Sequence, residues 1–322
     1  MLAVMATGFD AADPLAGLRV GEARRPAPPL GWVEVRVKAA ALNQHDLWSL
    51  RGVGLRADEL PRILGCDAAG VDGEGNEVVV HAVIGDADAG RGDETDDPRR
   101  SLLSERHDGT FASSVYVPAR NVLAKPAALS FEEAACLPTA WLTAYRMVFT
   151  RSATRPGDTV LVQGAGGGVA TAAIVLARAG GRRVWVTSRS PARRERALEL
   201  GADAAFEPGA RLPERVDAVI ESVGEATWAH SLRCVRPGGV IVVCGATSGD
   251  APSAELKRVF YQQLRVVGST MGSRDELLEL LRLCELTGVR PVIDRVLPLA
   301  SAREGFAAML AGDIFGKVVF SV

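Results

Sequence analysis

The stretch VLVQGAGGGVATAAIVLARAGG, residues 160–181, decides the fold of this chain because it joins a strand, a tight turn and a helix without interruption. An apolar run typical of a buried strand leads into small residues with the spacing Gly164-x-x-Gly167-x-x-Ala170. Glycine allows the tight turn and the approach of the backbone to a pyrophosphate, and the helix N-terminus offers free N–H groups to that charge. We therefore predict a dinucleotide site, with these cofactor-binding residues in the turn: Gly164, Gly166, Gly167, Gly168 and Val169. The alternative is a glycine-rich turn that binds no ligand.

Short apolar strands alternate with helical patterns along the middle of the chain. After the strand at 159–163 come the segments RVWVTS, VDAVIES, GVIVVCG and RVVGST. This alternation predicts a parallel, doubly wound sheet. The residues before about position 120 read instead as strands and irregular connections, and 322 residues exceed what one hydrophobic core usually holds. We therefore expect an α/β protein of two domains.

The residues after the second strand of this series indicate which dinucleotide binds. An NAD site usually has an acidic residue there for the ribose 2′-hydroxyl, whereas this chain has no acid before Glu195. Ser188, Arg189 and Arg193 supply a hydroxyl and two guanidinium groups, which suit a 2′-phosphate. We predict NADP(H) as the cofactor, bound in part by these three residues. The alternative is that the arginines only solvate the start of a helix.

Composition excludes several classes of protein. The net charge of −2 gives no electrostatic reason to expect nucleic acid or an acidic membrane surface as a partner. The five cysteines lie scattered among apolar residues, which is typical of reduced thiols in a cytoplasmic protein. The N-terminus lacks the pattern of a signal peptide, and no apolar run is long enough to span a membrane. We expect a cytoplasmic enzyme with a small-molecule substrate.

Two neighbouring segments carry residue types that bind metals. ALNQHDLW, residues 41–48, contains Asn43, His45 and Asp46, and GCDAAG, residues 65–70, contains Cys66. These segments, together with HDGTFASSVYVP, LSFEEAACLPTAWLTAYRMV, the glycine turn and the terminal GKVVF, resemble the medium-chain dehydrogenase/reductase superfamily over nearly the whole chain. The resemblance implies a GroES-like, β-rich catalytic domain at 1–121 and 290–322, a Rossmann domain with a doubly wound parallel sheet at 122–289, and a homodimer.

The resemblance also implies that both zinc sites of the zinc-dependent relatives are absent. Their three catalytic ligands fall here on Asn43, Cys66 and Thr139, which do not supply the thiolate and imidazole donors that zinc needs. The cysteine-rich lobe of those relatives falls on residues 85–108, which contain no cysteine. The charged segment 85–109 is expected to be a solvated surface loop. We therefore predict no metal, and we place the chain with the zinc-free quinone oxidoreductase-like branch.

The chemistry expected without zinc is hydride transfer to an acceptor that spreads its own charge. A quinone or an activated C=C, as in an enone or enoyl substrate, delocalises charge that hydrogen-bond donors can then stabilise. Two alternatives stay open. One is an alcohol/ketone dehydrogenase of the same superfamily, and the other is a crystallin-like protein that binds NADPH without turnover.

The resemblance implies the catalytic residues of this reaction. Asn43 would hydrogen-bond the nicotinamide ribose or a substrate oxygen, and Thr143 would meet the nicotinamide. Trp48 would offer a face to a flat substrate. His45 is a candidate proton donor, although a structural hydrogen bond is the alternative. The resemblance also implies further cofactor contacts at strand ends and in the terminal motif: Val223, Cys244, Gly245, Ala246, Ser269, Thr270, Met271 and Lys317.

Overall fold

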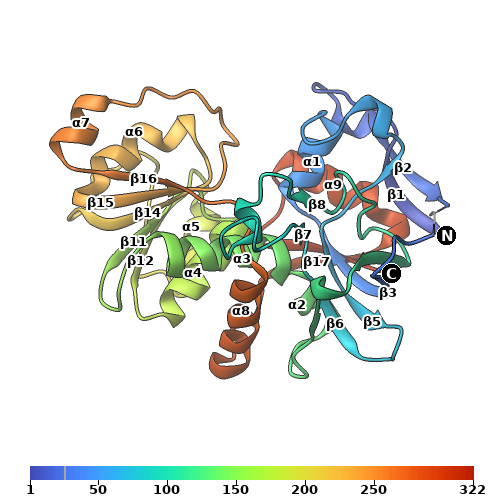
Figure 1. Cartoon of the computed structure of the whole chain (residues 1–322). Helices are drawn as coiled ribbons and strands as arrows, with labels where there is room; N and C mark the ends of the chain where they lie inside the picture. Colours follow the sequence, from blue (N-terminus) through green and yellow to red (C-terminus); the bar gives the residue numbers. More distant parts are fainter. Residues whose placement is uncertain (25–26) are drawn as a thin grey trace. The chain divides into compact units, whose positions relative to one another are not determined.

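The computed structural model describes residues 1–24 and 27–322, which divide into two compact units (Figure 1). The discontinuous unit comprises Met1–Ala140 and Met271–Val322, and the central unit comprises Trp141–Thr270. The first is rich in antiparallel strands and the second contains a parallel sheet. The expected α/β class, with one β-rich part and one doubly wound part, is confirmed.

The central unit is built on a six-stranded parallel sheet with the order β13-β12-β11-β14-β15-β16, which is 3-2-1-4-5-6 when the strands are counted within the unit. The strands are β11 (Thr159–Val162), β12 (Arg183–Thr187), β13 (Ala204–Phe206), β14 (Val216–Glu221), β15 (Val235–Val243) and β16 (Arg265–Gly268). The helices are α3 (Leu142–Tyr145), α4 (Gly168–Ala179), α5 (Pro191–Glu199), α6 (Glu225–Cys234) and α7 (Leu256–Tyr261). This order is the one found in dinucleotide-binding sheets.

Local sequence sets where the helices beside the glycine turn begin. α4 begins at Gly168, directly after the turn. α5 begins with Pro191 after Ser190, whose hydroxyl accepts a hydrogen bond from the N–H of Arg193 at 3.3 Å. Serine before the first helical residue and proline at it are the preferred start of a helix, because they satisfy or remove N–H groups that lack helical partners.

The discontinuous unit contains a seven-stranded sheet, a three-stranded sheet and a strand pair. The large sheet has the order β10-β6-β5-β3-β18-β17, and β9 also pairs with β3. Its strands are β3 (Trp32–Ala41), β5 (Asp67–Asp72), β6 (Glu77–Val80), β9 (Ser114–Pro118), β10 (Val122–Ala124), β17 (Ile293–Pro298) and β18 (Lys317–Ser321). The small sheet contains β1 (Leu2–Ala6), β2 (Leu18–Glu22) and β4 (Arg62–Ile63), and the pair is β7 (Val83–Ile84) with β8 (Ser101–Leu102).

The helices of the discontinuous unit are α1 (Gln44–Leu50), α2 (Phe131–Ala135), α8 (Arg274–Thr287) and α9 (Ala302–Ala311). Both ends of the chain meet in the large sheet, because β18 pairs antiparallel with β3. Three buried aromatic rings pack beneath this junction, with the ring centroid of Phe111 5.1 Å from that of Phe320 and 6.1 Å from that of Phe306. Along the described residues, no helix is both long enough and apolar enough to cross a membrane.

The compact units divide the chain at other points than the expected boundaries of 121/122 and 289/290. The segments 122–140 and 271–289 both belong to the discontinuous unit. Contacts of both segments agree with this division: β10 extends the large sheet by pairing with β6, and the N–H of Arg274 at the start of α8 donates to Glu94 at 2.6 Å. The boundaries taken from the family resemblance stay a prediction.

The segment 85–109 is not the solvated loop that its charge predicts. Glu94 is 3% exposed, and its Oε1 accepts hydrogen bonds from Nε2 of His81 at 3.0 Å and from the N–H of Arg274 at 2.6 Å. Burial alone would raise the pKa of Glu94, but these hydrogen bonds outweigh it and lower the pKa to about 2. A buried carboxylate therefore holds this segment to β6 and to the start of α8.

We expect Glu94→Gln to lower the free energy of unfolding at pH 7 by about 2–3 kcal/mol, because the ionised form is the one that the fold stabilises. A lowered folded pKa gives stability that is present above the ordinary value of 4.5 and is lost as the pH falls toward 2. Urea unfolding should therefore show a difference between variant and wild type that shrinks as the pH is lowered below 4.5. Asp96→Asn, in an exposed position of the same turn, is the matched control. Equal stability of Glu94→Gln and wild type at pH 7 would contradict this role.

Candidate functional site

The glycine turn of the central unit has the geometry that a pyrophosphate site needs. Gly164 and Gly166 adopt φ angles of +76° and +130°, which side chains disfavour. A Cβ at Gly164 would lie 2.6 Å from Cγ2 of Val223, so this glycine is also required for close packing. A Cβ at Gly167 would meet no atom within 4 Å, which leaves the side of the turn before α4 open. The residues present therefore fit a bound dinucleotide.

The arginines after β12 differ in their surroundings. Arg189 is exposed. The side chain of Arg193 covers the glycine turn, because its Cδ would lie 2.9 Å from a Cβ placed at Gly166. The guanidinium of Arg194 instead donates to the carbonyl of Ser188 at 2.7 Å and to Glu207 at 3.3 Å. Arg194 thus holds the backbone after β12, whereas Arg189 reaches solvent and Arg193 lies against the glycine turn.

The remaining predicted residues of the central unit lie at the carboxyl ends of its strands. Val223 follows β14, the run Cys244–Ala246 follows β15, and Ser269 and Thr270 follow β16. Because the strands are parallel, these ends share one edge of the sheet with the glycine turn. Thr143 is buried in α3 of the same unit.

Met271 and Lys317 lie in the discontinuous unit, and each has protein partners there. Met271 packs in a cluster with Cys66, Ala82 and Val83. Lys317 is 2% exposed, and its ammonium donates to the carbonyl of Leu42 at 2.8 Å. The same ammonium donates to Oδ1 of Asn43 at 2.5 Å and to Oδ2 of Asp67 at 3.2 Å, so all three of its hydrogens are used. The expected contact between Lys317 and a cofactor stays a prediction, and a cofactor atom would have to compete with these partners for the ammonium.

Asn43 is part of the same network. Its Nδ2 donates to Oδ2 of Asp67 at 2.8 Å and to the carbonyl of Ala41 at 3.2 Å, and it is 5% exposed. Every polar atom of this amide therefore has a protein partner, and a ribose or substrate oxygen would have to compete with them. Oδ1 of Asp67 has no hydrogen-bond partner among the described residues.

Asp46 holds the start of α1 against the loop before β5. Its carboxylate accepts from the N–H of Asn43 at 2.9 Å and from the N–H of Gly65 at 3.0 Å. Burial raises the pKa of Asp46 to about 6, and the charge of His45 and the two N–H groups lower it from a still higher value. Asp46 is therefore a buried carboxyl with two backbone donors, next to His45 in the chain.

His45 and Cys66 share a chain of polar contacts through Ser104. Nε2 of His45 lies 3.2 Å from Oγ of Ser104 and 4.0 Å from Oε1 of Glu105. Sγ of Cys66 lies 3.5 Å from the same Oγ. Ser104 and Glu105 escaped sequence analysis because only their place in the fold brings them to His45, although the sequence pattern around HDGTF lies beside them.

Trp48 is partly exposed in α1, but one of its faces is already covered. The guanidinium of Arg51 lies 5.1 Å from the ring centroid, at the distance of a cation–π contact. A flat substrate that stacked on this face would have to displace Arg51.

The residues at the expected metal positions do not fit zinc. The thiol of Cys66 is the only sulfur or imidazole donor at these positions, and it donates to the carbonyl of Leu103 at 3.2 Å. Asn43 is committed to Lys317 and Asp67. Across residues 1–24 and 27–322, no three His, Cys, Asp or Glu side chains are grouped to hold a metal ion.

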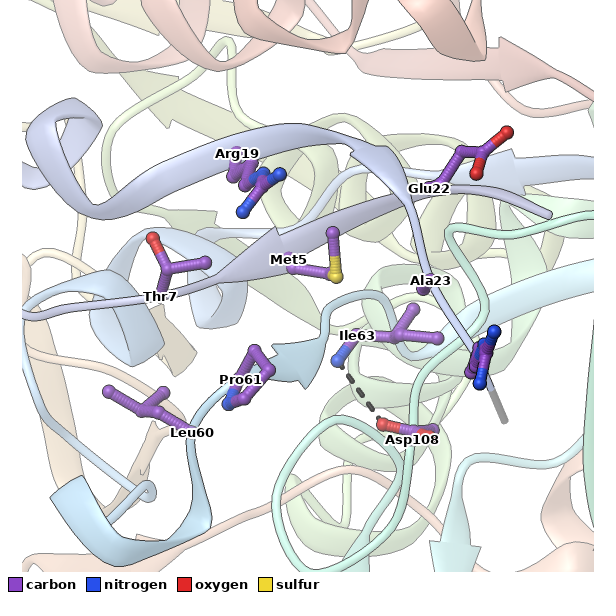
Figure 2. A pocket seen from close by; sticks show the side chains of 10 residues that line it. Met5, Thr7, Arg19, Glu22, Ala23, Leu60, Pro61, Ile63 and Asp108 are labelled. Carbon is purple, nitrogen blue, oxygen red and sulfur yellow. Dashed lines mark hydrogen bonds between the residues drawn. The ribbon is translucent and has the colours of Figure 1, made fainter. Parts of the chain in front are cut away.

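A hollow of about 560 Å³ lies elsewhere in the discontinuous unit and is lined by β1, β2 and the residues around β4 (Figure 2). Met5 and Ile63 contribute apolar surface, and Arg19, Glu22 and Asp108 contribute charge. Oδ1 of Asp108 accepts from the N–H of Ile63 at 3.2 Å. The residues predicted to bind cofactor or substrate do not line this hollow, so we do not include it in the candidate site.

A sheet of this order with a glycine turn after its first strand defines a dinucleotide-binding α/β protein. Residues 29–127 match a family model described as the alcohol dehydrogenase GroES-like domain, and residues 168–285 match one described as zinc-binding dehydrogenase. A zinc-type alcohol dehydrogenase-like protein of Schizosaccharomyces pombe is 31% identical, over 91% of each chain. The chain belongs to the medium-chain dehydrogenase/reductase superfamily.

Two solved structures show how closely the fold is shared. A protein described as an NAD-dependent alcohol dehydrogenase is 36% identical, with a TM-score of 0.92 and full coverage of both chains. A crotonyl-CoA carboxylase/reductase in complex with NADP is 25% identical, with a TM-score of 0.90 over all of this chain and 95% of the other. The superfamily thus contains relatives of this chain with different reactions on one fold.

The network around Lys317 yields a stability prediction. We expect Lys317→Met to lower the free energy of unfolding by about 3–5 kcal/mol, because it leaves the Asp67 carboxylate buried without its cation. The double variant Lys317→Met/Asp67→Asn should recover roughly half of that loss, because it removes the stranded charge. Urea unfolding measures both. A single variant as stable as wild type, or a double variant less stable than the single one, would show that the ion pair does not stabilise the fold.

Proposed function

We propose that this protein is an NADPH-dependent reductase that transfers hydride to a quinone or to an activated C=C of an enone or enoyl substrate, without a metal ion. The observation that carries the proposal is that the polar atoms of Asn43 and Cys66 hydrogen-bond to other groups of the protein. By the family resemblance, these two residues occupy positions where zinc-dependent relatives have ligands. Such residues cannot polarise a plain carbonyl as a Lewis acid does. An acceptor that delocalises its own charge needs no Lewis acid, because hydrogen-bond donors suffice for an enolate or phenolate.

The surroundings of the glycine turn support NADPH as the electron donor. No acidic residue ends β12, whereas Arg189 is exposed there and Arg193 covers Gly166. Two guanidinium groups favour a 2′-phosphate over a bare hydroxyl. The crotonyl-CoA carboxylase/reductase of similar fold was solved with NADP, which agrees with this proposal.

NADPH, when bound, supplies the hydride. The chain's own contribution is to hold the acceptor and to provide a proton, and His45 is our candidate donor because its imidazole is partly exposed and anchored at one nitrogen only. Thr143 is proposed to contact the nicotinamide, and the free face of Trp48 to contact a flat acceptor.

A second candidate is an alcohol/ketone dehydrogenase. The observation in its favour is the 36% identity to a protein described as an NAD-dependent alcohol dehydrogenase. It differs from our proposal in both cofactor and substrate, so two measurements separate the two functions.

For the cofactor, we expect Arg189→Ala and Arg193→Ala each to weaken NADPH binding roughly tenfold or more while changing NADH binding much less, because each loses a charge-assisted contact to the 2′-phosphate. Titration calorimetry with both nucleotides measures this. Arg183→Ala is the matched control, because Arg183 is at the opposite end of the same strand and pairs with Glu214. Equal losses for NADPH and NADH would show that these arginines do not distinguish the nucleotides.

For the reaction, we expect purified protein with NADPH to reduce members of a panel of quinones, enones and enoyl thioesters, at rates that a metal chelator does not change. The same protein is tested with alcohols and NADP⁺ or NAD⁺, and its zinc content is measured. Turnover confined to alcohols would favour the dehydrogenase. Stoichiometric zinc with chelator-sensitive rates would overturn the metal-free mechanism, and nucleotide binding without turnover of any acceptor would favour a non-enzymatic protein.

A further inference from the structure

A connected row of polar atoms in the discontinuous unit consists of Cys66, Ser104 and His45. The proposed reaction uses only the last of them, His45, as the proton donor. Cys66 and Ser104 are fully buried, whereas the side chain of His45 is 20% exposed. The row therefore runs from the interior to the partly exposed imidazole. Each of the two inner side chains carries a single polar hydrogen, so the direction of every hydrogen bond can be deduced by counting.

The hydrogen bond that Cys66 makes at the inner end of the row sets the direction of the others. Sγ of Cys66 lies 3.2 Å from the carbonyl oxygen of Leu103, and a carbonyl can only accept. The single hydrogen of the thiol is therefore used in this bond. Burial raises the pKa of the Cys66 thiol, which keeps that hydrogen in place near neutral pH.

The other two hydrogen bonds follow from the first. Because Cys66 has no second hydrogen, Ser104 must be the donor in the contact of 3.5 Å between Oγ and Sγ. Ser104 has then used its own hydrogen, so its oxygen must accept from Nε2 of His45 across 3.2 Å. The carboxylate of Glu105, 4.0 Å from Nε2, favours the same arrangement because it can only accept.

We infer that Cys66, acting through Ser104, holds the neutral imidazole of His45 as the Nε2–H tautomer and leaves Nδ1 as the nitrogen that exchanges a proton with the substrate. The second half of this inference rests on the proposed function. In that reaction the N–H bond at Nδ1 of the imidazolium breaks, a C–H or O–H bond forms on the reduced acceptor, and water restores the proton. Cys66 and Ser104 are thus positioning residues, and the thiol at a former ligand position keeps a role without binding metal.

The backbone of Ser104 offers a way to test this assignment. Its φ angle is +69°, in the left-handed region where glycine is preferred and a side chain is disfavoured. Glycine would therefore fit this position with less strain than serine. This also makes Ser104→Gly an informative variant, because it removes the hydroxyl without adding backbone strain.

The test is nitrogen-15 NMR of protein labelled at its four histidines, with His45→Gln used to assign the His45 signals. We expect wild-type neutral His45 to be protonated at Nε2 and unprotonated at Nδ1. In Cys66→Ala, Ser104 loses its acceptor and can donate to Nε2, so the share of the Nδ1–H tautomer should rise at least about fivefold. Cys66→Ser keeps one donor and an acceptor and should restore the wild-type signals. A wild-type Nδ1–H tautomer, or Cys66→Ala signals identical to those of wild type, would overturn the inference.

Two further variants keep the test decisive. Cys136→Ala removes another fully buried thiol, which donates to the carbonyl of Glu132, and it should leave the His45 signals unchanged. If Cys66→Ala does not fold, Ser104→Gly takes its place: we expect the Nε2 proton to exchange with water at least about tenfold faster than in wild type, because its acceptor is gone. An unchanged exchange rate would refute the role of Ser104.

Turnover provides an independent readout. With an accepted substrate, Cys66→Ala should lower kcat about tenfold and change KM less than about twofold, whereas Cys66→Ser should not. The tautomer is measured without substrate, so a correct tautomer in a protein that reduces no acceptor would refute the proposed function alone. Normal turnover with an unperturbed tautomer in Cys66→Ala would refute the positioning role alone.

Discussion

The buried ammonium of Lys317 is the interaction on which the arrangement of the discontinuous unit depends. A lysine that is 2% exposed must have its charge balanced and its hydrogens used, and here the carbonyl of Leu42, the amide of Asn43 and the carboxylate of Asp67 do both. Lys317 begins the last strand, Leu42 and Asn43 lie between β3 and α1, and Asp67 begins β5. One cation thus brings together three parts of the chain that are distant in sequence.

The positions of the reactive side chains follow from this network. Asn43 immediately precedes α1, so fixing its amide fixes the helix that carries His45. Asp67 immediately follows Cys66, so fixing its carboxylate places the thiol beside Ser104. The residues that resemble metal ligands are therefore occupied in building a frame, and the group left partly exposed at its edge is an imidazole. A frame of this kind can move protons, whereas it lacks donors for a Lewis acid.

The parts of the molecule that sequence analysis predicted well are those that depend on neighbours in the chain. The glycine turn, the helix after it and the parallel sheet follow from residues 159–181 and from the repeating strands, because their geometry is local. Sequence analysis could not predict the partners of Lys317, since Asn43 is 274 residues away and Asp67 is 250 residues away. The burial of Glu94 was missed for the same reason, because its partner Arg274 is 180 residues away. An acidic residue in the sequence indicates an exposed position only where no residue distant in the sequence donates a hydrogen bond to it in the fold.

Hydrogen bonds and metal ions organise a site in different ways, and this chain illustrates the difference. A metal ion draws several deprotonated donors to one point and fixes their positions. A row of hydrogen bonds such as Cys66, Ser104 and His45 fixes positions less tightly, and in the arrangement inferred above each member keeps a proton. Burial raises the pKa of Asp46 to about 6, so this carboxyl beside His45 is a second group that can carry a proton near neutral pH. In the proposed reaction one proton follows the hydride to the acceptor, so a row of hydrogen bonds that decides which imidazole nitrogen carries a proton would serve that step directly.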